Sequence, residues 1–380
     1  MEFRPTEGEV AVAKAAREFA ENEMRPVVME HDESQEFPLA IVRKLGELGF
    51  MGMTWPVELG GAALSDLEAV AVIEELARVD PSVALTVASH NSLCTGHIML
   101  FGSMEQKKTY VPDLASGRTL GAWGLTEPGS GSDSGGMRTT ARLEGNVWVL
   151  NGSKTFITQG SVASTYVIMA VTDQAKGKKG ISAFIVPAGL KGFTIGKKEN
   201  KLGMRSSDTA TLLFDDVAVP AENLLGNPGE GFRQALSVLD GGRIGIAALS
   251  VGIAQGALEA SIAYAKGRHQ FGRALAEFQA IQWKIADMAT EINAARIMTH
   301  RAAWLKTRGE PFSVAASKAK YFASEAAVRA AGEAVQIHGG YGFIKDYPVE
   351  KLYRDVKLMT IGEGTSEVQK TIIARHLLRG

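Results

Sequence analysis

Residues 146–152 are Asn146-Val147-Trp148-Val149-Leu150-Asn151-Gly152, a run of β-branched and aromatic residues that ends in a tight-turn dipeptide. This pattern predicts a β-strand followed by a hairpin turn. Further runs of the same kind lie at residues 166–171, 181–186 and 209–214. Glycine, lysine and aspartate turns separate these runs, whereas a parallel sheet would need helices between them. Residues 121–228 are therefore predicted to form an antiparallel β-sandwich or β-barrel domain.

Helical patterns lie on both sides of this strand-rich zone. Before it, Pro26 interrupts one amphipathic pattern, Gly49 ends another, and the nearly apolar residues 83–101 predict a buried helix. After it, apolar residues recur every three or four positions from Ile281 to Ala295, which is typical of helix bundles. Small residues gather between positions 245 and 260, so we expect that helix at the centre of the bundle. We predict an α+β fold with a helical N-terminal domain (1–120), a middle β domain (121–228) and a C-terminal four-helix bundle (229–380).

The composition is that of an ordinary soluble globular protein. Of the 380 residues, 45% are apolar and 22% are charged, and the net charge of −1 argues against nucleic acid as the main partner. We see no apolar run long enough to cross a bilayer, so no membrane association is expected. The single cysteine, Cys94, excludes an internal disulfide and is expected to be a small buried hydrophobe.

The first residues, Met1 to Arg4, start neither a signal peptide nor an Arg-rich transit segment. Together with the cysteine count, this start predicts a cytoplasmic protein, with a trimmed mitochondrial matrix enzyme left open.

Common site motifs are absent from the sequence. No Rossmann glycine fingerprint, P-loop, zinc-protease motif, Cys-x-x-Cys pair or nucleophile elbow occurs. The seven histidines are scattered without metal-ligand spacing, so we expect no metal site. His90, His97 and His300 are expected to be hydrogen-bonded structural residues.

Four segments, three of them with glycines, and one carboxylate remain as candidates for a site. The segments are residues 125–133, 154–158, 268–272 and 336–342. These segments suit a ligand with polar rings or phosphate, because they offer hydroxyls, backbone N–H groups, aromatic rings and one arginine. Each segment also has a plainer interpretation: a flexible loop, a strand, a capping arginine and a helix C-cap.

Glu363 lies between Gly362 and Gly364, just before a final helix. A carboxylate flanked by glycines can be approached closely by a small substrate, and it can act as a base in an apolar pocket. The plainer interpretation is a helix N-terminus, with Thr365 or Ser366 as the N-cap.

Taken in this order, the segments resemble the acyl-CoA dehydrogenases, a family of FAD-containing enzymes. The resemblance extends from Phe37 to Leu378, and residues 101–107 and 240–247 are similar to the short-chain (butyryl-CoA) branch. It implies an acyl-CoA dehydrogenase-like fold and a homotetramer. It also implies oxidation of a short, medium or branched acyl-CoA to a trans-2-enoyl-CoA, in fatty-acid or branched amino-acid catabolism. The electron acceptor it implies is electron-transfer flavoprotein.

The resemblance assigns roles to individual residues. Glu363 matches the base that takes the α-proton while the β-hydrogen leaves as hydride to flavin N5. Gly242 stands where some branches carry the base instead. Ser132, Asp240, Arg243 and Gly364 match substrate-binding positions. The implied FAD contacts, some of them reaching in from a neighbouring subunit, are Trp123, Leu125, Thr126, Gly131, Ser132, Phe156, Ile157, Thr158, Arg268, Phe271, Gln279, Gln336, Ile337, His338, Gly339, Gly340, Thr365, Ser366 and Glu367.

Two departures from the family pattern bear on function. Phe156 replaces the usual tryptophan, which changes how the flavin packs. Gly362 replaces a tyrosine of short- and medium-chain members, so we expect a larger acyl pocket. The alternatives are an acyl-CoA oxidase that reduces O₂ and a flavin-binding family member without dehydrogenase activity; Glu363 argues against the second.

Overall fold

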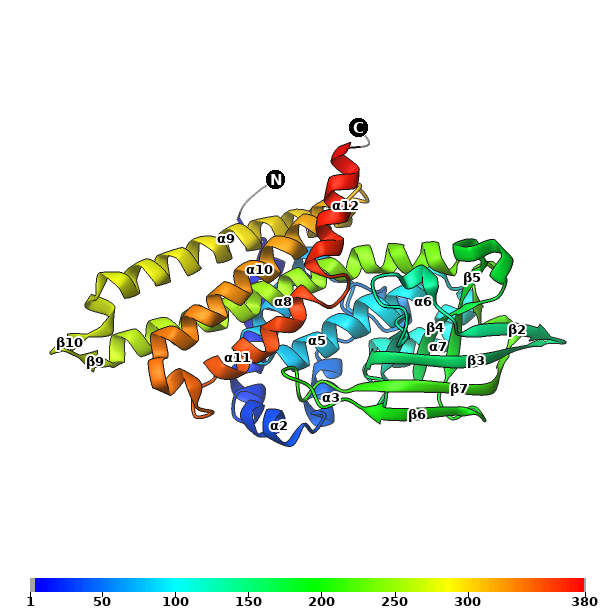
Figure 1. Cartoon of the computed structure of the whole chain (residues 1–380), viewed down its shortest axis with the longest axis horizontal. Helices are drawn as coiled ribbons and strands as arrows, with labels where there is room; N and C mark the ends of the chain where they lie inside the picture. Colours follow the sequence, from blue (N-terminus) through cyan, green and yellow to red (C-terminus); the bar gives the residue numbers. More distant parts are fainter. Residues whose placement is uncertain (1–3, 379–380) are drawn as a thin grey trace.

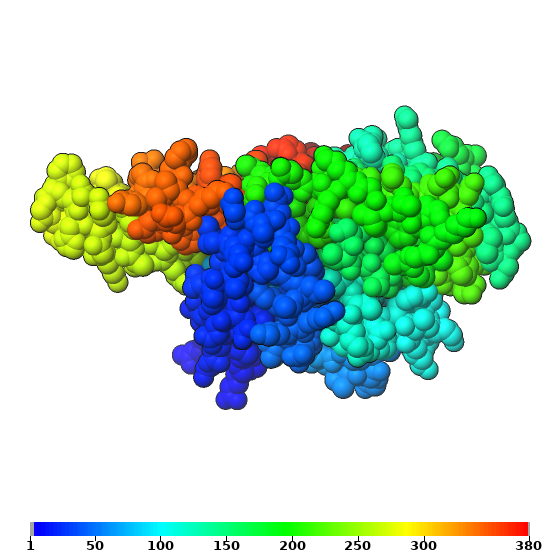
Figure 2. Space-filling view, turned by 90° about the horizontal axis from the view of Figure 1, so that it is seen from below, coloured from blue at the N-terminus to red at the C-terminus, as the bar shows by residue number. Residues whose placement is uncertain are grey.

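The computed structural model describes residues 4–378. Outside the described residues lie Met1, Glu2, Phe3, Arg379 and Gly380. The prediction that the chain has no leader segment rests partly on the first three of these residues. The molecule is elongated, with long helices at one end and a sheet at the other (Figure 1). The N-terminal helices project from the long axis when the molecule is seen from below (Figure 2).

The N-terminal part is helical, as predicted. Thr6, Ser65 and Ser103 each begin a helix with a capping box, which satisfies backbone N–H groups at the helix start. The buried run 83–101 forms two helices joined by a π-helical turn at His90–Thr95. The helices of this part are α1 (Glu7–Phe19), α2 (Val28–Ser34), α3 (Leu39–Glu47), α4 (Asp66–Ala77), α5 (Pro81–Ser89), α6 (Gly96–Phe101) and α7 (Met104–Ala115).

The middle part is one eight-stranded sheet in the order β6-β7-β3-β2-β4-β5-β8, with β1 paired to β4. Most neighbours are antiparallel, as predicted, but β1 and β2 each pair with β4 in parallel, so the sheet is mixed. Strand-forming stretches of a sequence do not indicate which strands become neighbours in the sheet. The strands are β1 (Gly121–Gly124), β2 (Thr140–Glu144), β3 (Val147–Thr158), β4 (Thr165–Val171), β5 (Ile181–Pro187), β6 (Phe193–Lys198), β7 (Thr209–Pro220) and β8 (Leu224–Leu225).

The turn predicted at Asn151-Gly152 is wrong. Both residues lie inside β3, where the register against β7 shifts between Leu150 and Gly152. Gly152 has φ 138°, and a Cβ there would lie 2.7 Å from Thr139, so the glycine marks a β-bulge. The hairpin turn between β2 and β3 instead contains Gly145, with φ 59°. Pairing of β3 with β2 and β7 overrides the local turn signal.

The C-terminal part is built around α8, the predicted helix rich in small residues. Gly252 and Gly256 allow close approach to the N-terminal part, since a Cβ at either position would lie within 2.4 Å of a backbone oxygen there. By length and composition α8 could cross a membrane, but 72% of its apolar window is buried inside the protein. This part comprises α8 (Gly231–Gly267), the short strands β9 (His269–Gln270) and β10 (Arg273–Ala274), α9 (Gln279–Thr307), α10 (Ser313–His338), α11 (Val349–Asp355) and α12 (Ser366–Leu378).

A buried ionic junction joins the three parts. Lys351 on α11 donates to Asp355 (2.6 Å) and to Asp80 at the start of α5 (3.0 Å). Asp355 also accepts the backbone N–H of Met204 from the loop before β7. The apolar core is likewise continuous through all three parts. The division at residues 120 and 228 stays a proposal.

Candidate active site

Glu363 lies on a left-handed turn between α11 and α12. Its φ is 53° and that of Gly364 is 94°, so two consecutive residues adopt the conformation that favours glycine. The turn leads directly into α12, where Thr365 Oγ1 accepts the backbone N–H of Val368 at 3.3 Å. Of the two N-cap candidates, Thr365 and Ser366, it is therefore Thr365 that caps α12. The left-handed backbone of Glu363 is of the strained kind that active-site residues often show.

The carboxyl group of Glu363 lies in a crowded, partly dry position. Its Oε2 is buried and has no hydrogen-bond partner among the described residues. Burial raises the pKa of Glu363 to about 7, against the opposing charges of Lys320 and Arg243. The carboxyl packs against Gly242 on α8, because a Cβ at that position would lie 2.0 Å from Oε2. The alternative position for a base is thus filled by the Glu363 side chain itself.

Two residues that the sequence did not single out hold this turn. Lys320 on α10 donates to the Gly364 carbonyl at 2.7 Å, and Gln369 on α12 donates to the same oxygen at 2.9 Å. Both side chains are fully buried. Lys320 shares a helical face with Ala316, Ala323 and Ala327, which are buried as well. A lysine at helical spacing within an alanine stripe is a signal that could have identified Lys320 from the sequence.

Three of the four predicted substrate residues gather at the turn. Asp240 and Arg243 form an ion pair one turn apart on α8, on either side of Gly242, and Gly364 adjoins Glu363. Arg243 is buried and its Nε has no partner among the described residues. Ser132 is exposed in the loop before β2, and no described contact joins it to the other three.

The loop that contains Leu125, Thr126, Gly131 and Ser132 is anchored at its base. Glu127 forms a buried ion pair with Lys154 at 2.7 Å and accepts the backbone N–H groups of residues 138 and 139. Lys154 also donates to the Leu125 carbonyl at 3.2 Å. The tip stays open, since a Cβ at Gly129 or Gly131 would meet nothing within 4 Å.

The strand segment with Phe156, Ile157 and Thr158 adjoins this loop. Thr155 donates its N–H to the Thr126 carbonyl at 2.9 Å, which ties the two segments together. Ile157 points into the core, while the Phe156 ring is 65% exposed on a residue with φ 56°. An exposed aromatic side chain on a left-handed residue of a central strand provides an open apolar face for a ring ligand.

The indole N–H of Trp123, on β1, donates to His97 Nδ1 at 3.0 Å. Since Nδ1 accepts, Nε2 carries the proton and donates to Gln234 on α8 at 3.0 Å. Burial lowers the pKa of His97 to about 4, so the ring is neutral. His90 and His300 also have hydrogen-bond partners, and Cys94 is buried, as the sequence predicted.

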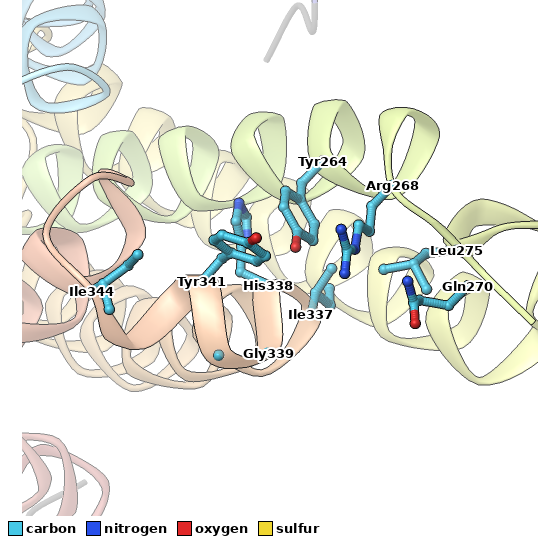
Figure 3. A pocket seen from close by; sticks show the side chains of 10 residues that line it. Tyr264, Arg268, Gln270, Leu275, Ile337, His338, Gly339, Tyr341 and Ile344 are labelled. Carbon is cyan, nitrogen blue, oxygen red and sulfur yellow. The ribbon is translucent and has the colours of Figure 1, made fainter.

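A second group of predicted residues lies at the far end of α8. Arg268, at the end of α8, stands over the ring of Tyr341, and both line a pocket of about 450 Å³ with Ile337, His338, Gly339 and Gly340 (Figure 3). Arg243 and Arg268 lie about 37 Å apart along α8 at about 1.5 Å per residue. This pocket and Glu363 therefore belong to different places on one chain. The remaining members lie nearby: Gln336 is exposed at the end of α10, Phe271 is 94% exposed between β9 and β10, and Gln279 begins α9.

Models of the acyl-CoA dehydrogenase N-terminal, middle and C-terminal domains match residues 6–118, 122–217 and 229–378. A short-chain specific acyl-CoA dehydrogenase of Clostridium acetobutylicum is 49% identical over 379 residues, which covers 100% of both chains. The chain belongs to the acyl-CoA dehydrogenase family. As a member it is a flavoprotein oxidoreductase with FAD as its cofactor, so the predicted family, fold and cofactor are confirmed.

Solved structures of the family superpose over the whole chain. Butyryl-CoA dehydrogenase from Megasphaera elsdenii matches with a TM-score of 0.98 and 44% identity, covering 100% of both chains. A chain from a structure described as the electron transferring flavoprotein of Acidaminococcus fermentans matches with a TM-score of 0.99 and 47% identity, also covering 100% of both chains.

The residues present fit FAD. A Cβ at Gly129, Gly131, Gly339 or Gly340 would meet open space, so backbone can approach a ligand at both groups of residues. Arg268 beside the two later glycines suits a pyrophosphate, and the exposed Phe156 suits a flavin ring. No cluster of three His, Cys, Asp or Glu side chains that could hold a metal ion occurs within residues 4–378.

Proposed function

We propose that Glu363 is the base that removes the α-proton of an acyl-CoA thioester and so generates a trans-2-enoyl-CoA. The observation that carries the proposal is the carboxyl group itself, with Oε2 buried and unpartnered and a pKa of about 7. A base with a pKa near the working pH is both ionised in useful amount and strong enough to take a proton. Asp240, Arg243 and Gly364 would then lie along the bound substrate.

The thioester carbonyl must be polarised before a carboxylate can take its α-proton. The backbone N–H of Glu363 has no acceptor among residues 4–378, which leaves it free to donate to the carbonyl oxygen. One donor of this kind is typically worth about 3–4 kcal/mol of transition-state stabilisation. Exclusion of water by the acyl chain would strengthen this interaction.

The flavin would lie against the segments that hold Trp123, Leu125, Thr126, Gly131, Ser132, Phe156, Ile157 and Thr158. When bound, FAD supplies the acceptor for the β-hydrogen, which leaves as hydride. Thr365, Ser366 and Glu367 follow the base and are assigned to the same cofactor. The Lys154–Glu127 ion pair would keep the loop in place for the ring.

The pocket with Arg268 and Gly340 would serve a neighbouring subunit. It lies too far along α8 to reach a flavin beside Glu363 of the same chain. Together with Phe271, Gln279 and Gln336, it would hold the pyrophosphate and adenosine of the neighbour's FAD. This reciprocal arrangement needs at least two subunits, and the family resemblance extends it to the homotetramer that cross-linking and light scattering of the holoenzyme would test.

The acyl pocket is proposed to accept branched or longer chains as well as butyryl. A Cβ at Gly362 would meet only Leu358, at 3.5–3.7 Å, so a larger residue would fit there and its absence leaves room. Steady-state kcat/KM for straight chains from butyryl to dodecanoyl, and for branched acyl-CoAs, tests this. Strict preference for butyryl-CoA would contradict it.

Anaerobic bleaching of bound FAD by a panel of acyl-CoAs is the experiment that tests the function. The holoenzyme should lose its visible flavin absorbance with at least one acyl-CoA, while the Glu363→Gln variant keeps it. A flavin that no acyl-CoA bleaches would refute the dehydrogenase reaction and favour a binding role.

Electron-transfer flavoprotein is the proposed electron acceptor. The likeness to a chain from a structure of an electron transferring flavoprotein supports it. Substrate-dependent peroxide release in air, without this partner, would instead favour an acyl-CoA oxidase. A cytoplasmic location stays a prediction.

A further inference from the structure

One buried cation beside the proposed base has no assigned role. Lys320 has 0% of its surface exposed, and its ammonium contacts the turn that carries Glu363, with the Gly364 carbonyl at 2.7 Å. Burying a lysine is costly unless its charge and its donors are used. No carboxylate lies within ion-pair distance of Lys320 in the described structure, in contrast with the other fully buried lysines, Lys154 and Lys351.

The turn needs such a contact. Glu363 is not a glycine, yet it has φ 53°, a conformation that costs of order 1–3 kcal/mol unless its surroundings fix it. Lys320 from α10 and Gln369 from α12 both donate to the Gly364 carbonyl, so the turn is held from two helices. The helices α10 and α12 lie side by side at this point (Figure 1).

The charge of Lys320 also acts on the Glu363 carboxyl. Burial raises the pKa of Glu363 and the positive charges of Lys320 and Arg243 oppose that rise, with Lys320 the larger of the two. Burial in turn lowers the pKa of Lys320 to about 8, against the attraction of Glu363. The other charged groups that act on this pair are Arg243 from α8, Glu325 from α10 and Glu367 from α12, and Asp240 on α8 pairs with Arg243.

We infer that Lys320 is a positioning residue that fixes the left-handed turn under Glu363 and supplies the positive charge opposite its carboxylate. The hydrogen bond sets where the carboxyl lies. The charge keeps a dry carboxylate ionised at neutral pH. The role in turnover rests on the function proposed for Glu363, whereas the coupling between the two groups does not.

The test compares Lys320→Met with Lys318→Met in the FAD-loaded enzyme. Methionine preserves the length and apolar stem of the lysine but removes the donor and the charge. Lys318 is on the same helix two positions away, so its side chain projects on another face. The carboxyl pKa of Glu363 is read by infrared titration of its C=O stretch, which Glu363→Gln identifies by its loss.

In Lys320→Met the carboxyl pKa should rise by about one to three units, as when an opposite charge is removed from nearby. The acid limb of kcat/KM should move to higher pH by the same amount, and Lys318→Met should change neither. Lys320→Arg, which keeps the charge, should restore much of the wild-type limb.

An unchanged carboxyl pKa in Lys320→Met would overturn the inference, whatever happens to the rate. An equal shift in Lys318→Met would do the same. If Lys320→Met does not fold, Lys320→Gln, polar but uncharged, takes its place with the same expected shift. The infrared reading does not need turnover, so it decides the inference even if no acyl-CoA proves to be a substrate.

Discussion

Two buried clusters of charge lie in the C-terminal part of the molecule, and they are built on opposite principles. At the domain junction, Lys351 donates to both Asp80 and Asp355, and Arg354 binds Asp32. At the active site, Lys320 and Arg243 are buried and Glu363 is half-buried with its Oε2 inside, yet Lys320 has no ion-pair partner and Glu363 Oε2 and Arg243 Nε have no hydrogen-bond partner among the described residues.

The pKa values follow this difference. Burial alone would lower the pKa of Lys351, but the charges of Asp355 and Asp80 outweigh it and raise that pKa above its ordinary value. Burial prevails at Lys320 and lowers its pKa to about 8, and it raises that of Glu363 to about 7. Paired charges fix a structure, whereas buried charges left unpaired stay able to exchange protons near neutral pH.

The largest effect is expected from Glu363→Gln. Glutamine keeps the shape of the side chain but cannot take a proton, so kcat should fall by about 10²- to 10⁴-fold. The fold should be retained, because the carboxyl makes no hydrogen bond that the amide would lose. Turnover and circular dichroism of the FAD-loaded variant check this. Retained turnover would remove Glu363 from the mechanism.

The corresponding change at the junction is Lys351→Met. It leaves Asp80 and Asp355 buried without their cation, which should destabilise the protein by about 3–5 kcal/mol. Thermal unfolding of the holoenzyme measures the loss. Lys345→Met, which breaks an ion pair with Glu33 on the surface, is the control and should leave the melting temperature unchanged.

An equal loss in both lysine variants would contradict the contrast between a paired junction and an unpaired site. A change in the pH dependence of turnover in Lys351→Met would contradict it as well, because no residue of the junction acts on the Glu363 carboxyl.

Gly242→Ala tests whether the position of the Glu363 carboxyl against α8 matters for turnover. Its Cβ would lie 2.0 Å from Glu363 Oε2 and must displace the carboxyl, since α8 is too well packed to move. A misplacement of about 1 Å typically lowers a rate on the order of 10²-fold. Gly241→Ala is the control, because its Cβ meets only the tip of Lys306 at 3.8 Å. Both variants should fold, as alanine favours helix.

The sequence predicted the fold in outline because the spacing of apolar residues indicates which face of a helix or strand is buried. The helix spacing from Ile281 to Ala295 and the strand runs are local patterns, and the structure has the helices and strands they predict. The turn at Asn151-Gly152 and the parallel pairings of β4 could not be predicted in this way. They depend on which strands lie on either side, and that is a property of the whole sheet.

The candidate site was only partly accessible from the sequence. Glu363 could be singled out by its glycines, and family likeness gave its role. Gln369 was missed because it lies in an ordinary helical run. Lys320 stands in an alanine stripe that marks it as buried, but only the folded chain brings both side chains to the Gly364 carbonyl. The distance between Arg268 and Arg243 likewise follows from an unbroken α8, which local motifs do not reveal.

The smallest expected effect is the pH dependence that distinguishes the two clusters. Glu363 must be ionised to act, so kcat/KM should rise about tenfold per pH unit below its pKa of about 7 and level off above it.

The same raised pKa, against 4.5 for an ordinary glutamate, means that the contribution of this carboxyl to stability is present below pH 4.5 and lost as the pH rises through about 7. Lys351 has its pKa raised from 10.5, so its contribution is complete below that pH and is lost only as the pH rises through the still higher folded value. Between pH 6 and pH 8 the site should therefore titrate while the junction does not. Melting temperatures of wild type and Glu363→Gln, measured from pH 4 to pH 8, should coincide below pH 4.5, separate between pH 4.5 and pH 7 and differ by a constant amount above pH 7, with the variant the more stable. Parallel curves would mean that the Glu363 carboxyl is not the group that titrates.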